Sequence, residues 1–312
     1  MNGRVPTPKP FESTPFAKSL LREMMQGRGP LFADWHEGLH PSLRSGADAV
    51  MAEDRVRPHS HLSARNSSMG LALNLALPFR LGDPGGLGSL LTEVLGCPFR
   101  VERVLFEYGG PGDILGELAG DTPEPDEPFT PADIAVFGTS GDGRTGVVLL
   151  EVKLTEGGFN PCTGAESRGN RHPEVCASAR LFFESPKECY LRRPVRAVRD
   201  RRYWTIFAAA HGSVDAAFPG ERSGACPFRG GAQQIMRNHA LALGLLQAGR
   251  ADWWAFGLVH HDRNDDVPPT WDAYVASTVD APHFFRLPAS RIATAGPHAD
   301  WLAERYRWSQ RA

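Results

Sequence analysis

Two acidic residues and a lysine occupy positions from which they could act together on one metal ion. Asp133 lies in one apolar segment, and Glu151 and Lys153 lie near the end of the next. Between the segments, Asp142-Gly143 is typical of a tight hairpin turn, so we expect an antiparallel pair of strands. Asp133 and Glu151 are equally far from residue 142, which places them opposite one another with Cβ atoms about 5 Å apart. Because side chains alternate along a strand, Lys153 lies on the same face as Glu151.

This arrangement indicates metal-assisted chemistry on phosphate. Two carboxylates so close repel each other, and one of them holds its proton unless a cation lies between them. Carboxylate oxygens suit Mg²⁺ or Mn²⁺. Lys153 would then orient or deprotonate an attacking water, or stabilise charge on a phosphate, as in hydrolysis of a phosphodiester. On spacing alone, an alternative stays open in which Asp133 caps a loop while Glu151 and Lys153 form a surface ion pair.

Hydrophobic patterns predict the elements that must position this hairpin. We expect helices over residues 67–78, 89–95 and 233–247, and strands over residues 100–108, 132–137, 146–154 and 252–260. The order is therefore helix, three strands, helix, strand. The nearly continuous apolar run of residues 146–154 predicts a central strand that is buried on both faces. Residues 1–65, which are rich in proline, arginine and histidine, are expected to be a loosely built N-terminal extension that contributes little chemistry.

The spacing of the acidic residues resembles the motif of the PD-(D/E)XK nuclease superfamily, across roughly residues 67–262. The sequence departs from that motif at Ala132, which separates Pro131 from Asp133. The resemblance implies an α/β protein with a restriction-endonuclease-like core, in which a mixed central sheet of order αβββαβ is flanked by helices. It also implies that Asp133 and Glu151 bind the metal and that Lys153 serves the water. An upstream acid would hold the metal directly or through water; this is Glu93 on the helix 89–95, with Glu102 and Glu107 as competing candidates.

A second similarity concerns the helix expected over residues 233–247. Gln233-Gln-Ile-Met-Arg-Asn238 resembles the glutamine-containing helix motif of the RecB-like branch of the superfamily. The resemblance implies that Gln234 and Arg237 contact DNA or the active site. The alternative is that both belong to the ordinary polar face of an amphipathic helix.

Four cysteines follow the Glu-Val-Lys strand: Cys162, Cys176, Cys189 and Cys226. Four thiolates are what a tetrahedral zinc ion or a cubane iron–sulfur cluster needs, although no pair has the spacing of a zinc ribbon. Some RecB-like nucleases carry such a cluster, and that similarity favours iron–sulfur (4Fe–4S) over zinc. Free, partly buried thiols are the alternative, and we place Cys97 among these. The cysteines would belong to an insertion at about residues 160–228 within a nuclease-like domain of residues 66–312.

Residues 192–202 contain six arginines and adjoin Tyr203 and Trp204. Arginine pairs with phosphate and aromatic rings stack on bases, so this segment predicts contact with nucleic acid, principally through Arg192, Arg193 and Arg196. The alternative is a solvated basic face that pairs with the acidic loop of residues 121–128.

Composition limits the classes of protein to consider. The chain has 312 residues, 41% of them hydrophobic, and a formal charge of −2, so it can form a core but has no overall positive field. Without a long apolar stretch or a signal-peptide pattern, we expect a soluble, cytoplasmic protein. The sequence thus predicts a Mg²⁺-dependent deoxyribonuclease, active in restriction, phage defence or repair, with DNA as partner, RNA not excluded, and possibly a defence-system protein. A non-catalytic nucleic-acid-binding protein or a metal-stapled interaction protein on the same fold is the alternative.

Overall fold

A computed structural model of the chain describes residues 14–308 apart from 57, 59–60, 119–130 and 193–199. Its central layer is one five-stranded sheet of order β1-β2-β3-β4-β5. The strands are β1 (Phe99–Tyr108), β2 (Ala132–Ser140), β3 (Thr145–Lys153), β4 (Trp253–His260) and β5 (Phe284–Pro288). The pairs β1–β2 and β2–β3 are antiparallel, whereas the pairs β3–β4 and β4–β5 are parallel. The protein is therefore a mixed α/β fold, as the sequence predicts.

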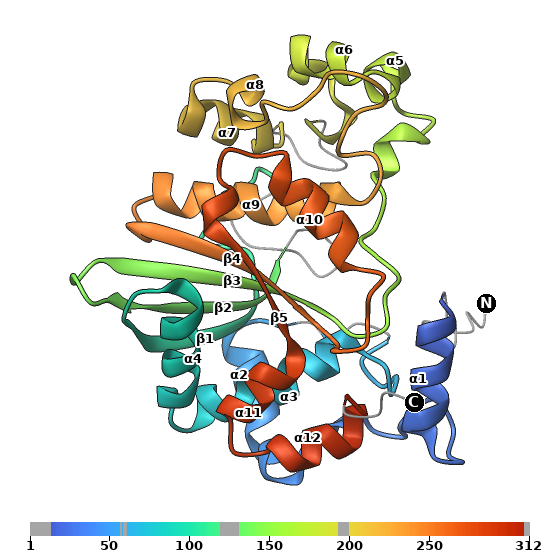
Figure 1. The fold of residues 1–312 in the computed structure, drawn as a ribbon, viewed down its shortest axis with the longest axis vertical. Helices are drawn as coiled ribbons and strands as arrows, with labels where there is room; N and C mark the ends of the chain where they lie inside the picture. The colour runs from blue at the N-terminus through green and yellow to red at the C-terminus, as the bar shows by residue number, and fades with distance from the viewer. Residues whose placement is uncertain (1–13, 57, 59–60, 119–130, 193–199, 309–312) are drawn as a thin grey trace.

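Helices cover both faces of this sheet (Figure 1). The lower layer contains α1 (Pro15–Met25), α2 (Arg44–Glu53), α3 (Ser68–Leu81), α4 (Gly85–Leu95), α11 (Ala289–Ala295) and α12 (Ala299–Tyr306). The upper layer contains α9 (Ala232–Gln247) and α10 (Pro268–Ala276), with α5 (Pro173–Ala177), α6 (Ala179–Glu184), α7 (Tyr203–His211) and α8 (Val214–Ala217) farther from the sheet. In the part of the chain that the structure describes, no helix is long and apolar enough to cross a membrane.

The hairpin predicted from the sequence forms with the expected register. Ile134 pairs with Leu150 and Gly138 pairs with Gly146, so the strands are symmetric about residue 142. Gly143 has φ 83°, a left-handed conformation that favours glycine in this turn. β3 is the middle strand and is buried along all but its first residue, because helices cover both of its faces. The prediction of a central strand is confirmed.

Two local predictions differ from the structure. The sequence predicts that the first core helix ends near Pro78, but α3 continues to Leu81 with Pro78 buried inside it. Proline removes one backbone donor near the end of this helix, and the burial of most of the α3 side chains offsets that loss. β5, a short edge strand at the parallel end of the sheet, has no counterpart in the predicted order.

The described part of the N-terminal extension is packed tightly. Leu20, Leu43 and Val50 are buried in the lower hydrophobic core together with residues of α3 and the sheet. Arg263, beyond β4, forms an ion pair of 2.7 Å with Glu23 of α1. Residues 14–56 therefore share a core with the rest of the chain, in place of the loose extension expected.

Candidate active site

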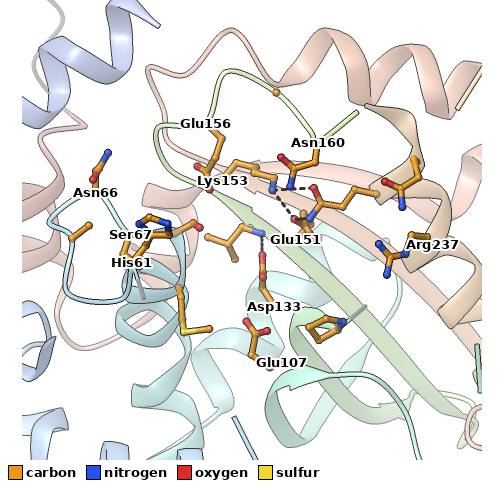
Figure 2. Close-up of a pocket in the computed structure, with 18 residues that line it drawn as sticks. His61, Asn66, Ser67, Glu107, Asp133, Glu151, Lys153, Glu156, Asn160 and Arg237 are labelled. Atoms are coloured by element: carbon orange, nitrogen blue, oxygen red, sulfur yellow. Dashed lines mark hydrogen bonds and ion pairs between the residues drawn. The ribbon is translucent and has the colours of Figure 1, made fainter. Parts of the chain in front are cut away.

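Three neighbouring strands place three carboxylates in one row. Because Ile134 pairs with Leu150, the next position along the hairpin sets Asp133 beside Glu151. The register between β1 and β2 sets Glu107 on the other side of Asp133. Glu107 has φ 46°, an uncommon conformation for a residue with a side chain. Figure 2 shows the carboxylates of Glu107 and Asp133 close together on the side of the cavity below Glu151.

Simultaneous ionisation of Glu107, Asp133 and Glu151 is unfavourable, because the carboxylates are buried and repel one another. Burial, and then the neighbouring charge of Glu151, raise the pKa of Glu107 to about 7. Burial also raises the pKa of Asp133 well above its ordinary value, with Glu151 and Glu107 adding to the effect. The backbone amide of Val152 donates to Asp133 Oδ2 at 2.6 Å and acts in the opposite direction. This arrangement favours either protonation or a bound cation.

Lys153 supplies a buried positive charge beside these acids. Its Nζ lies 2.8 Å from Glu151 Oε1, and the two side chains are 8% and 2% exposed. Burial alone would lower the pKa of Lys153, but the carboxylates of Glu151, Glu156 and Asp133 raise it above its ordinary value. These carboxylates favour the ammonium form of Lys153, so its side chain is a buried cation beside the acids.

Helix α9 holds Glu151 with two amide side chains one turn apart. Gln234 Nε2 donates to Glu151 Oε1 at 2.6 Å, and Asn238 Nδ2 donates to Glu151 Oε2 at 2.8 Å. Gln234 also accepts a hydrogen bond of 3.3 Å from Lys153 Nζ through its Oε1. The structure thus places Gln234 at the acid–lysine pair. Asn238 was not among the predicted site residues, although its spacing of four residues from Gln234 places both on one helix face.

The amide of Asn238 should contribute measurably to stability. We expect Asn238→Ala to lower the free energy of unfolding by about 1–3 kcal/mol, because it leaves a buried carboxylate oxygen without its donor. Chemical denaturation measures this loss. In a Glu151→Gln background the same substitution should cost clearly less, and an equal cost in both backgrounds would contradict the pairing.

Arg237 lines the cavity and forms an ion pair with Glu117. Its Nη2 lies 2.6 Å from Oε1 of buried Glu117, and Tyr203 donates its hydroxyl hydrogen to the same carboxylate. Arg237 therefore ties α9 to α7 and to the loop that carries Glu117. Its contact with nucleic acid stays a prediction.

One cavity of about 440 Å³ joins these groups. It is lined by acids of the strands, by Lys153, by the start of α9 and by Glu156 and Asn160 after β3. His61, Asn66 and Ser67 form another part of its wall (Figure 2). The segment 61–66 therefore contributes to the candidate site, in contrast to the expectation that residues 1–65 carry little chemistry.

Glu93 is not brought to this cavity. It lies on the outside of α4, 70% exposed, and forms an ion pair of 2.8 Å with Arg291. Glu102 is exposed on β1 and bonds to Arg100 and Thr139. Of the three candidates for the upstream acid, Glu107 is the one that lines the cavity. The choice of Glu93 is corrected because α4 presents it to solvent, away from the strand ends.

The basic segment is only partly within the described residues. Arg193 and Arg196, and the acidic loop 121–128, lie outside them. Arg192 is partly exposed and pairs with Asp200. Tyr203 and Trp204 are buried, at 0% and 5% exposure, in the upper hydrophobic core. They cannot stack on bases in this conformation, which corrects the role suggested for them.

The four cysteines of the insertion lie in the segment between β3 and α9. Cys176 and Cys189 are buried and Cys162 and Cys226 are half-buried, whereas Cys97 is exposed after α4. All five are free thiols. Among the described residues, no three His, Cys, Asp or Glu side chains have the arrangement of ligands around a single ion.

Comparison with known proteins gives one match. The sequence model of a family described as "Restriction Endonuclease associating with ARP" matches residues 35–294. The chain belongs to this family. The match includes the hairpin, the insertion, α9 and residues 35–56 of the N-terminal segment. It supports a restriction-endonuclease-like protein. No curated protein and no solved structure matches the chain significantly.

Proposed function

We propose that this member of the family is a metal-dependent nuclease of the PD-(D/E)XK type that hydrolyses phosphodiester bonds of DNA. The observation that carries the proposal is the row of Glu107, Asp133 and Glu151 beside the buried ammonium of Lys153, in one cavity. The family description names a restriction endonuclease, which favours DNA as the substrate.

The residue types of the row suit a hard divalent cation, but no three acidic side chains of the described residues are arranged around one ion, so these side chains must move to bind it. Glu107, Asp133 and Glu151 offer carboxylate oxygens, the ligands that Mg²⁺ and Mn²⁺ prefer. A cation there would relieve the repulsion that raises the pKa values of Glu107 and Asp133. Both oxygens of Glu151 accept hydrogen bonds from α9 or Lys153, so Glu151 must exchange one of these to become a ligand. When bound, the metal would supply Lewis acidity toward the phosphate and lower the pKa of water, which is the nucleophile.

The chain's own residues have distinct parts in the proposed reaction. Lys153 stays charged and stabilises the negative charge that develops on the phosphate, or orients the attacking water. Gln234 and Asn238 are positioning residues, because they fix the carboxylate of Glu151 and, for Gln234, the ammonium as well. The arginines at residues 192–202 and Arg237 are candidates for contact with the DNA backbone.

The biological setting belongs to the same proposal. The family description names association with ARP, so ARP is a candidate partner of this chain. A role in restriction or phage defence is in keeping with that description; the description does not mention repair.

The direct test is cleavage by the purified full chain. Linear and circular DNA, and RNA of matched sequence, are incubated with Mg²⁺, with Mn²⁺ and with a chelator. We expect cleavage of DNA that requires the metal, and product ends distinguish endonuclease from exonuclease action. Binding of DNA without cleavage under any of these conditions, alone or with ARP, would favour the rival assignment of a non-catalytic DNA-binding protein.

Cleavage should depend on pH through Glu107. Its pKa of about 7 means that it is protonated in acid and must lose the proton before it can bind a metal. At limiting Mg²⁺, the rate should rise by about tenfold per pH unit below pH ~7 and then level off. Saturating Mg²⁺ should shift this profile to lower pH, since the cation competes with the proton. A profile unchanged in Glu107→Gln would rule out this assignment.

A further inference from the structure

Two arginines that are far apart in the sequence meet over one aromatic ring in the lower layer. The guanidinium carbon of Arg65 lies 4.1 Å from the centroid of the Phe32 ring, and that of Arg305 lies 4.8 Å from the same centroid. Arg305 is in the last turn of α12, where it also faces the ring of Trp301 at 5.5 Å. Arg305 and Trp301 are half-buried, so a ligand can reach this arginine pair from solvent.

Arg65 is held in place before any ligand binds. Its backbone amide donates to the carbonyl of Pro30 at 3.0 Å, and its side-chain Nε donates to the carbonyl of Gly29 at 2.7 Å. Stacking on Phe32 fixes the plane of the guanidinium. Within the described residues, the two terminal nitrogens of Arg65 have no hydrogen-bond acceptor. They form a preorganised fork of donors, the geometry that binds phosphate or carboxylate with two parallel bonds.

Neither arginine of the pair has an acidic partner in the part of the chain that the structure describes. Charged side chains are seldom buried without an opposite charge, yet Arg65 is only 8% exposed. Arg305 makes no hydrogen bond to a described residue, and its Nε is buried without an acceptor. In the same layer, by contrast, Arg263 forms an ion pair of 2.7 Å with Glu23. Buried donors without partners are unfavourable, which favours an anion from outside the chain.

Repulsion within the pair acts in the same direction. Burial, and then the charges of Arg305 and Arg28, lower the pKa of Arg65. Glu37 opposes this shift, but its influence is the smallest of the four. An anion bound between the guanidinium groups would relieve both the repulsion and the loss of hydration.

The arginine pair adjoins the wall of the candidate active site. Ala64 and Asn66, the neighbours of Arg65 in the chain, both line the cavity that contains the acid row. A nucleic-acid strand with one phosphate at the acid row carries further phosphates on either side of it. Contacts to such phosphates set the register of a strand without reading its sequence.

We propose that Arg65 and Arg305 bind a backbone phosphate of the DNA strand that occupies the acid row. The identity of the strand rests on the proposed function, whereas the contact itself requires no catalysis. This site is separate from the arginines at residues 192–202, which belong to the insertion on the other face of the sheet (Figure 1).

The test is the affinity of the full chain for double-stranded DNA, measured by fluorescence anisotropy with a chelator so that metal-dependent cleavage is absent. We expect Arg305→Gln to weaken binding by about tenfold, equally for unrelated sequences. The slope of log affinity against log salt should fall by about 1. Arg144→Gln is the matched control, because it removes one charge from an exposed ion pair in the hairpin turn, and it should bind within about twofold of wild type.

Two further measurements separate binding from folding. Without DNA, the melting temperature of Arg305→Gln should stay the same or rise, because the variant loses a buried donor that has no acceptor. Arg65→Lys keeps the charge but not the planar fork, so it should also bind DNA more weakly than wild type while it keeps the salt dependence. A lower melting temperature of Arg305→Gln with wild-type affinity would mean that the pair only supports the fold, and would overturn the proposal.

The outcomes distinguish this proposal from the proposed function. If DNA is cleaved but a folded Arg305→Gln protein binds it as tightly as wild type, the phosphate contact is rejected and the nuclease assignment stands. Binding that depends on both arginines, without cleavage under any condition, would support the contact and reject the nuclease. Unchanged DNA affinity together with lost binding of ARP, or with lost stabilisation by inorganic phosphate, would assign the site to another anion and overturn the proposal.

Discussion

Asp133→Asn is expected to lower the Mg²⁺-dependent rate of DNA cleavage by about 10³-fold. Asp133 is the middle member of the acid row, and asparagine keeps its shape but removes the charge that would hold the metal. Rates under single-turnover conditions measure this effect.

The thermal stability of Asp133→Asn shows whether a slow variant has lost its catalytic group or has simply unfolded. The folded-state pKa of Asp133 is raised, so its ionised form costs stability at neutral pH, and this cost grows as pH rises above the unfolded value. Asparagine has no such cost and can still accept the bond from Val152, so the melting temperature should stay the same or rise. Glu93→Gln is the matched control and should cleave within about twofold of wild type, because Glu93 is largely exposed and its ion pair with Arg291 is a surface pair outside the cavity. An active Asp133→Asn protein would refute the metal-site assignment.

Lys153→Ala should reduce cleavage by about 10²- to 10³-fold at saturating Mg²⁺. Lys153 is the buried ammonium at the acid row, and its removal takes away the charge that faces the phosphate or the water. Unlike Asp133→Asn, this change leaves Glu151 without its cation, so we also expect a loss of stability of about 3–5 kcal/mol.

Controls make that second result interpretable. Lys153→Gln keeps a polar group and a similar length, so it should fold better than the alanine variant and still be slow. Lys18→Ala, at an exposed position of α1, should change neither rate nor stability. Cleavage at the wild-type rate by a folded Lys153→Gln protein would show that the ammonium has no part in the reaction.

The acid pair was predictable because local rules determine it. The hairpin needs only a turn signal and two apolar strands, and its symmetry about residue 142 then sets Asp133 opposite Glu151. Lys153 follows from alternation along the same strand. The presence of Gln234 at the site was predicted through a resemblance, and the structure adds its bonds to Glu151 and Lys153.

The misplacement of the upstream acid has a physical cause. The sequence alone does not show which of the candidate acids faces the hairpin. The packing of α4 turns Glu93 toward Arg291 and solvent, whereas the pairing of β1 with β2 sets Glu107, with its left-handed backbone, beside Asp133. Tyr203 and Trp204 were assigned to DNA because they adjoin arginines, but burial depends on what packs against α7.

By itself, the sequence determined the central hairpin, the acid pair with its lysine and the mixed α/β class, since each depends on contacts between residues near in the chain or on strand periodicity. Three features depended on tertiary packing: Glu107 completes the row, Asn238 holds Glu151, and residues 61–66 wall the cavity. These features join segments separated by tens of residues or more, and their geometry depends on how layers pack on the sheet, which no local pattern encodes.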